Sequence, residues 1–174
     1  MAGLRGSSPG EVFQTFRNHV NSLLHRTICE IGLKGNQGYI SFRQADSAIA
    51  AKLRSGGWYL YLGQTLGAVK EAHRTWRLRT LSYSYRIQRG PRQDEPYLFR
   101  FEYESREMVE RLHPRRHLHV PVKLPVPNTR REINLDKVHV PTGWVTIEEL
   151  LRFLIRGLGV RSRSSELGPD PSSE

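Results

Sequence analysis

The sequence predicts an α+β fold in which an antiparallel sheet packs against an N-terminal and a C-terminal helix. Apolar residues recur at helical spacing near both ends of the chain, and aromatic residues alternate with polar ones in its middle. A length of 174 residues suits one compact domain with an appended segment, and it is enough to bury a hydrophobic core.

The N-terminal helix is expected to begin at Ser8, whose hydroxyl can cap it. Pro9 suits the first helical position, and Glu11 stands where a capping box places it. The glycine-containing stretch 32–38 ends this helix. Its apolar stripe comprises Phe13, Phe16, Val20, Leu23, Leu24 and Ile28.

Shorter elements are expected between this helix and residue 75. Residues 39–42 read as a strand, and the apolar run 58–62 as a buried strand or the start of a helix. Residues 45–53 and 66–74 read as helices. Residues 1–75 are therefore predicted to be a basic, mostly helical N-terminal segment.

The clearest strand prediction covers residues 76–87. Its alternation breaks once, near Thr80 and Leu81, where a bulge would restore the register. In residues 97–103, aromatic and charged side chains alternate, which predicts a half-buried strand. The two strands are expected to form an antiparallel hairpin.

A third alternating stretch covers residues 117–120. The prolines that limit this stretch favour an edge strand. Residues 128–140 show no clear pattern. The prolines are Pro121, Pro125 and Pro127.

A C-terminal helix is expected after Thr146, which forms a second capping box with Glu149. It should end at Gly157 or Gly159. Residues 76–160 would thus hold the sheet and the last helix, followed by a disordered tail at 161–174. The apolar stripe of the helix comprises Ile147, Leu150, Leu151, Leu154, Ile155 and Leu158.

The net charge of +10 predicts a polyanionic partner, RNA or DNA. Only five of the 27 cations are Lys, and Arg favours bidentate contact with phosphate. A GC-rich genome would explain part of the arginine content but not the excess of basic over acidic residues. Residues 1–87 carry a net +8, against +2 for residues 88–174. The candidate nucleic-acid contacts are Arg17, Arg26, Arg43, Arg54, Lys70, Arg74, Arg77, Arg79, Arg115 and Arg116.

Cytoplasmic localisation is expected. The single cysteine, Cys29, excludes a disulfide within the chain and fits a reducing compartment. No apolar run approaches the length of a membrane span, and residues 1–10 lack the apolar centre of a secretory signal.

Four of the seven histidines lie between residues 113 and 139. In an extended chain, His117 and His119 project from one face, while Arg100 and Glu102 share a face of the preceding strand. With His113, these groups have the parts for RNA cleavage that needs neither metal nor cofactor. One imidazole would deprotonate the 2′-hydroxyl, another would protonate the leaving oxygen, and arginine would stabilise the charged phosphorane.

Three other interpretations compete for the same residues. His117 and His119, with Glu102 or His113, could ligate a transition metal and drive metal-dependent hydrolysis. Arg115, Arg116 and the histidines could instead position a phosphate backbone without cutting it. The histidines could also lie on a solvated face without a function.

The aromatic residues of the two long predicted strands could stack on bases, but a stripe of this kind more often forms the core face of a sheet, and we favour the core. Burial is also favoured for Trp76, although it is flanked by Arg74 and Arg77. The stripe comprises Tyr83, Tyr85, Tyr97, Phe99, Phe101 and Tyr103.

Several motifs follow one another in the second half of the chain. They are Ser82-Tyr83-Ser84-Tyr85-Arg86, Leu98-Phe99-Arg100-Phe101-Glu102-Tyr103, His113-Pro114, His117-Leu118-His119 and Thr146-Ile147-Glu148-Glu149-Leu150-Leu151. In this order, residues 83–158 resemble the TumE-type toxin family of prokaryotic toxin–antitoxin loci. The resemblance implies a small α+β protein with a small twisted antiparallel sheet and a C-terminal helix. It also implies a toxin of a two-gene module, with an antitoxin as partner.

The leading hypothesis is a TumE-like protein of a toxin–antitoxin or antiviral defence module that acts on RNA. A second hypothesis is a non-catalytic DNA- or RNA-binding subunit of a larger defence complex. A third is a module that recognises an acidic protein such as an antitoxin. The candidate site of the first hypothesis comprises Arg100, Glu102, His113, Arg116, His117 and His119.

Overall fold

The computed structural model describes residues 4–23, 29–44, 47–53, 56–72, 75–93, 95–105, 114–127 and 129–161. Its N-terminal elements are β1 Arg5–Gly6, α1 Pro9–Leu23, β2 Cys29–Lys34, β3 Gln37–Gln44, β4 Ser47–Ala48, β5 Ala51–Lys52 and β6 Tyr59–Ala72. The remaining elements are β7 Thr75–Gln88, β8 Tyr97–Glu104, β9 Arg116–His119, β10 Lys123–Pro125, β11 Glu132–Asn134, the 3₁₀ turn η1 Leu135–Lys137, β12 Val140–Pro141 and α2 Ile147–Leu158.

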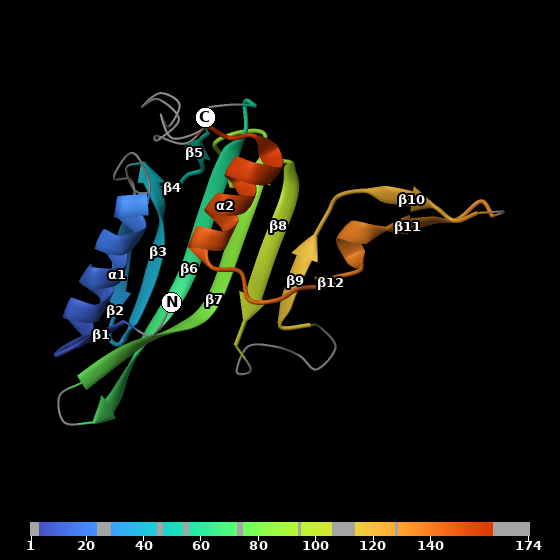
Figure 1. Cartoon of the computed structure of the whole chain (residues 1–174). Helices are drawn as coiled ribbons and strands as arrows, with labels where there is room; N and C mark the ends of the chain where they lie inside the picture. The colour runs from blue at the N-terminus through green and yellow to red at the C-terminus, as the bar shows by residue number, and fades with distance from the viewer. Residues whose placement is uncertain are drawn as a thin grey trace, which may run out of the picture.

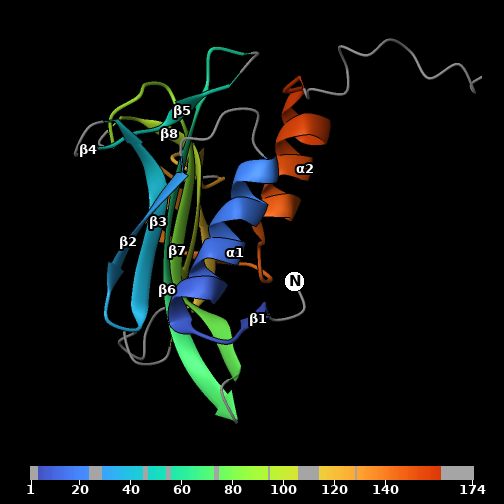
Figure 2. The ribbon, with the colours of Figure 1, turned by 90° about the vertical axis from the view of Figure 1, so that its left-hand side faces the viewer.

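A ten-stranded antiparallel sheet dominates the fold, with the strand order β12-β9-β8-β7-β6-β3-β2 and with β1, β4 and β5 paired to its members. Both α1 and α2 pack on the same face of this sheet, which we call the covered face (Figures 1 and 2). The opposite face is called the open face. The α+β class is confirmed, but the sheet is larger than the small one expected.

Side-chain alternation along β8 determines what each face carries. Phe99 and Phe101 make edge-to-face contacts with Phe153 of α2, with ring centroids 5.6 and 6.2 Å apart. Arg100 and Glu102, which alternate with these phenylalanines along the strand, must therefore project from the open face.

The prediction of a mostly helical segment at residues 1–75 is wrong for the described residues, which hold one helix and six strands there. Residues 66–72 belong to β6 rather than to a helix, because β6 hydrogen-bonds to β3 on one side and β7 on the other. Those ladders outweigh the helix propensity of Ala68 and Lys70. The sheet therefore continues across the expected boundary at residue 75.

Two further element predictions need correction. Residues 47–52 hold the short strands β4 and β5 instead of a helix. The strand at 117–120, predicted to lie at an edge, is flanked by β12, where Val140 pairs with Leu118. The segment 128–140, for which the sequence showed no clear pattern, contributes β11, η1 and the start of β12. The hairpin formed by β10 and β11 projects away from the main sheet (Figure 1).

The other strand predictions are confirmed. Residues 39–42 lie in β3 and residues 58–62 largely in β6. Strands β7 and β8 pair antiparallel. Thr65 lies opposite Ser82 while Leu66 lies opposite Thr80, so Leu81 is the bulged residue.

Both helices begin as their cap residues predict. The Glu11 amide donates to the Ser8 hydroxyl at 3.2 Å, although the Glu11 carboxylate accepts from the Ser7 amide rather than from Ser8. Thr146 and Glu149 complete the second capping box. Gly159 ends α2 with a φ of 64°, which glycine adopts without strain. Residues 24–28 and the expected disordered tail from 162 onward lie outside the described residues.

The hydrophobic core fills the space between the covered face and the helices. Tyr83 and Tyr85 are buried there, and Trp76 packs against the same cluster, which confirms the core assignment for these residues. His19 of α1 donates to the Glu148 carboxylate of α2 at 2.8 Å. Burial alone would raise the pKa of Glu148, but hydrogen bonds led by that from His19 hold the pKa below its usual value. No helix in the described part of the chain is long and apolar enough to cross a bilayer.

We expect Thr146→Ala to lower the free energy of unfolding by about 1 kcal/mol, because it leaves the Glu149 amide without its cap. Urea unfolding measures the change. Thr146→Ser keeps a hydroxyl at the cap and should retain most of the stability. Equal stability of wild type and Thr146→Ala would contradict the role of the cap.

Candidate functional site

A cluster of polar side chains lies on the open face, where β8 pairs with β9. Glu102 lies opposite His117 and Arg100 lies opposite His119. One Glu102 oxygen, Oε2, lies 3.4 Å from Nε2 of His117 and 3.2 Å from Nε2 of His119. Both imidazoles are buried, at 8% and 3% exposed. Four of the six residues of the predicted candidate site thus come together. Arg116 lies over the Trp144 ring instead, and His113 lies outside the described residues. We call Arg100, Glu102, His117, His119 and the neighbouring His139 the open-face cluster.

Backbone carbonyls orient the two strand imidazoles. Nδ1 of His117 lies 2.8 Å from the carbonyl oxygen of Pro114, and Nδ1 of His119 lies 2.8 Å from that of Asp136. A carbonyl oxygen only accepts, so each Nδ1 carries the proton and donates it. The lone pairs of the neutral rings are then on Nε2, and each Nε2 lies within 3.4 Å of Oε2 of Glu102.

The two oxygens of Glu102 have different partners. Oε1 accepts from the Ser84 hydroxyl at 3.4 Å and lies 3.5 Å from Nε of Arg100. These contacts hold the carboxylate so that Oε2 faces the imidazoles. The Nε2 atom of His119 is fully buried and has no hydrogen-bond partner.

His139 completes a group of three imidazoles. Its ring centroid lies 4.9 Å from that of His117 and 4.6 Å from that of His119, in edge-to-face geometry. Donor nitrogens of the three rings lie within 4.8 Å of one another. The backbone of His139 has a φ of 49°, a left-handed conformation that costs energy in any residue other than glycine.

Tyr97 and Asp136 support the cluster from the side. The Tyr97 hydroxyl donates to the Asp136 carboxylate, and the backbone of Asp136 holds His119. Burial, together with this hydrogen bond, raises the pKa of Tyr97 to about 12. The Arg100 guanidinium lies 5.0 Å from the centre of the Tyr97 ring, within cation–π range.

Arg86 and Arg100 lie directly opposite each other on β7 and β8. The Nε atoms of both are buried without a hydrogen-bond partner. Arg86 also lies 5.1 Å from the Tyr61 ring centre, and its Nη1 donates to the Gln93 carbonyl at 2.6 Å. Like charges that face each other across a sheet are unfavourable. The Glu102 carboxylate, with Oε1 3.5 Å from Nε of Arg100, partly offsets this repulsion.

The cluster differs from the acid–base pair expected of a metal-free nuclease. Such a pair needs its two active nitrogens on either side of a phosphate, one for each oxygen. The Nε2 atoms of His117 and His119 instead converge on one oxygen of Glu102. Imidazole nitrogens and a carboxylate arranged in this way can also serve as metal ligands.

The predicted basic residues are distributed over other elements. Arg77 pairs with Glu71 at 2.8 Å, and Lys70 and Arg79 are exposed near the end of the β6–β7 hairpin. Arg116 lies 5.0 Å from the Trp144 ring centre, and the exposed Arg115 precedes β9. Arg17 lies on α1, and Arg43 lies on β3 with its side chain not described. Arg26, Arg54 and Arg74 lie outside the described residues.

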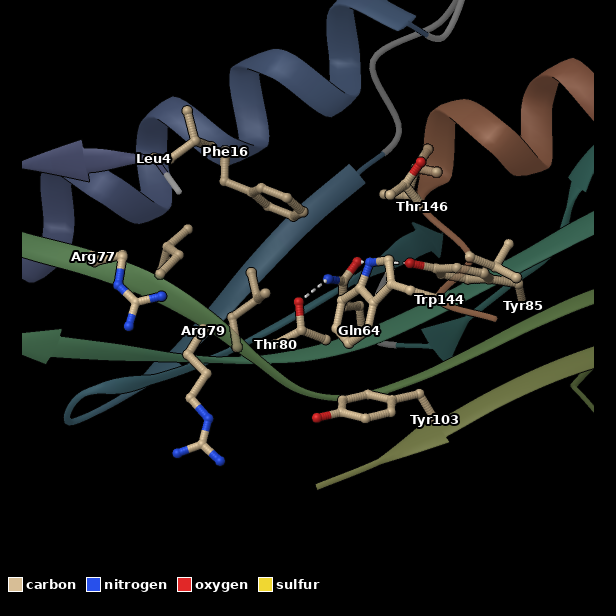
Figure 3. Close-up of a pocket in the computed structure, with 14 residues that line it drawn as sticks. Leu4, Phe16, Gln64, Arg77, Arg79, Thr80, Tyr85, Tyr103, Trp144 and Thr146 are labelled. Carbon is tan, nitrogen blue, oxygen red and sulfur yellow. Dashed lines mark hydrogen bonds between the residues drawn. The ribbon is translucent and has the colours of Figure 1, made fainter. Parts of the chain in front are cut away.

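A cavity of about 340 Å³ lies on the covered face. The amide of Gln64 at its base donates to the Thr80 hydroxyl and accepts from the Tyr85 hydroxyl, both at 3.0 Å. The side chains of Arg77 and Arg79 point away from α1 and α2 (Figure 3). The histidines and Glu102 do not line it.

Sequence reasoning did not assign Ser84, Arg86, Asp136 or His139 to the site. The density of histidines between residues 113 and 139 was a signal for His139. Arg86 could have been found from the register of the predicted hairpin, which places it opposite Arg100. Nothing in the local pattern marks Asp136, whose backbone carbonyl and carboxylate lie 2.8 and 3.4 Å from Nδ1 of His119.

The chain matches no protein-family model, no curated protein and no solved structure. Functional inference therefore depends on the geometry of the open-face cluster and on the charge of the chain.

We expect the stability of the protein to fall between pH 10 and pH 12 partly through Tyr97. A pKa raised from 10.0 to about 12 means that the folded state holds the phenol proton more tightly than the unfolded state. This contribution is complete below pH 10 and is lost as the pH rises through about 12. Urea unfolding across this range should show a smaller loss for Tyr97→Phe than for wild type. Equal losses would mean that the contact with Asp136 does not hold the proton.

Proposed function

We propose that the protein binds RNA on its open face and acts as the toxin-like member of a prokaryotic toxin–antitoxin or defence module, with the open-face cluster as its ribonuclease centre. The single observation that carries this proposal is the pair Arg86 and Arg100 beside Glu102, His117 and His119. Two opposed guanidiniums with unsatisfied buried donors suit a phosphate, and reactive groups lie on the adjoining strand.

Charge and sequence resemblance support the same proposal. The net charge of +10 favours association with a polyanion. The resemblance to TumE-type toxins covers β7, β8, β9 and α2, and three of these elements carry the cluster and its arginines. An antitoxin is the partner that the resemblance implies.

The cluster contains the chemical groups that RNA cleavage requires. The 2′-oxygen attacks the adjacent phosphorus and loses its proton to a base, while the bond from phosphorus to the 5′-oxygen breaks and that oxygen takes up a proton. Imidazole and carboxylate groups can exchange these protons, and guanidiniums can stabilise the charged phosphorane. In a metal-assisted version, the imidazoles and Glu102 would hold the ion instead.

A second candidate function is nucleic-acid binding without cleavage. It is favoured by the exposed cations of the β6–β7 hairpin, Lys70 and Arg79, which lie away from the cluster along the sheet. The two candidate functions make different predictions for loss of His117 and His119. The ribonuclease would lose its activity in cells, whereas a protein that only binds nucleic acid would keep it.

We expect Arg86→Gln combined with Arg100→Gln to weaken binding of single-stranded RNA and to reduce its salt dependence. Each lost phosphate contact lowers the slope of log affinity against log salt by about 0.7. Fluorescence anisotropy at several salt concentrations measures both quantities. Arg152→Gln with Arg156→Gln on α2 removes the same charge elsewhere and should have the smaller effect. Equal effects of the two double variants would place RNA away from the open face.

We expect His117→Ala with His119→Ala to reduce RNA cleavage by about 100-fold or more and to abolish growth inhibition in cells. His19→Ala, which removes a histidine from α1, is the control and should retain both activities. If the double variant keeps both activities, the ribonuclease proposal is wrong. If wild type binds RNA without cutting it, the second candidate function is supported instead.

A further inference from the structure

We infer that His117, His119, His139 and Glu102 bind one divalent transition-metal ion, with zinc as the reference case. The four residues come from β8, β9 and the residue before β12, and they meet on the open face. The inference concerns the same site as the proposed function but does not require RNA to be the substrate.

The tautomers of His117 and His119 place two nitrogen lone pairs at the cluster. Both Nδ1 atoms of His117 and His119 donate to backbone carbonyls, which leaves an unprotonated Nε2 on each neutral ring. Two nitrogen lone pairs then face a carboxylate oxygen at 3.4 and 3.2 Å. Three acceptors this close repel one another unless a cation lies among them.

Protonation of the imidazoles is the alternative source of positive charge. A charge-assisted N–H···O bond is typically about 2.7–2.9 Å long, which is shorter than both distances to Oε2. Nε2 of His119, in a side chain only 3% exposed, has no hydrogen-bond partner at all. A buried nitrogen that lies 3.2 Å from a carboxylate oxygen without a hydrogen bond to it is better explained as a metal ligand than as the donor of a hydrogen bond.

The distances fit coordination. Ligand atoms bound tetrahedrally about 2.0–2.1 Å from zinc lie about 3.3 Å from one another. The separations of 3.4 and 3.2 Å between Oε2 and the two nitrogens match this value. Donor nitrogens of the three histidines lie within 4.8 Å of one another, so side-chain shifts on the order of 1 Å bring them to the spacing of zinc ligands.

The surroundings provide the outer contacts that metal sites use. Each strand histidine donates its second ring N–H to a carbonyl, which fixes the tautomer and the orientation of the ring. Ser84 and Arg100 engage Oε1 and leave Oε2 for the ion. The left-handed backbone of His139 brings the third imidazole to the cluster, a conformation of the kind that persists at functional sites.

The donor set selects the kind of metal. Three imidazoles and one carboxylate suit zinc and its first-row neighbours, whereas magnesium and calcium prefer oxygen ligands. We therefore expect zinc or cobalt to bind in the presence of excess magnesium.

The test uses untagged full-length protein that is stripped with a chelator, incubated with Zn²⁺ in excess Mg²⁺ and desalted. Elemental analysis should give about one zinc per chain. His139→Ala and Glu102→Gln should each lower the affinity by about tenfold or more, because each removes a ligand. His19→Ala removes a histidine that binds Glu148 on the helices and should bind zinc as wild type does.

Two further measurements keep the test independent of folding defects. Zinc should raise the melting temperature of wild type and of His19→Ala, but not that of His117→Ala with His119→Ala. Cobalt should give wild type a visible absorption band that added zinc displaces. If wild type retains no zinc and shows no thermal shift, the inference is overturned, whether or not the variants fold. Equal zinc affinity in wild type, His139→Ala and Glu102→Gln would also overturn it.

RNA cleavage separates this inference from the proposed function. Zinc binding without cleavage would leave the metal site standing and remove the ribonuclease. Undiminished cleavage by protein that binds no zinc would support the ribonuclease and overturn the metal site.

Discussion

Backbone pairing along β8 determines which side chains meet on both faces of the sheet. Its ladders to β7 and β9 set Arg100 opposite Arg86 and His119, and Glu102 opposite Ser84 and His117. The alternate residues of β8 pack against α2. A slip of one residue would bury the charged side chains and expose the aromatic ones, so the core and the cluster depend on the same register. Packing of Phe99 and Phe101 thus positions the polar groups on the other side.

Local features of the fold were predictable because their causes are local. Cap residues marked the starts of both helices, and a break in the alternation marked the bulge at Leu81. The helix predicted at 66–74 was wrong because residues 66–72 form one arm of a hairpin with β7, and Leu66 and Gly67 also pair with the distant strand β3. The local propensity of residues 66–74 contains no information about the pairing with β3. Propensity decides an element only where tertiary pairing does not compete with it.

The residues of the candidate site were predictable where they lie on strands that the sequence predicts. His117, His119, Arg100 and Glu102 lie on strands whose alternation is visible in the sequence, so their common face could be inferred. His139 and Asp136 reach the cluster only after the chain has passed through the β10–β11 hairpin. Most of the candidate nucleic-acid contacts were predicted in the N-terminal half of the chain. Those that are described occupy several elements, and Arg77 is paired with Glu71.

The β10–β11 hairpin leaves the sheet after β9 and returns just before β12 (Figure 1). Its two ends are held at the cluster by His119 and by Asp136, whereas all three residues of β10, Lys123, Leu124 and Pro125, are exposed. Insertions or substitutions at the far end would therefore leave the distances among the histidines unchanged. Over evolutionary time the chain could acquire new surfaces there while the geometry of the open-face cluster stays the same. The hairpin thus separates an exposed extension of the chain from the contacts that position the histidines.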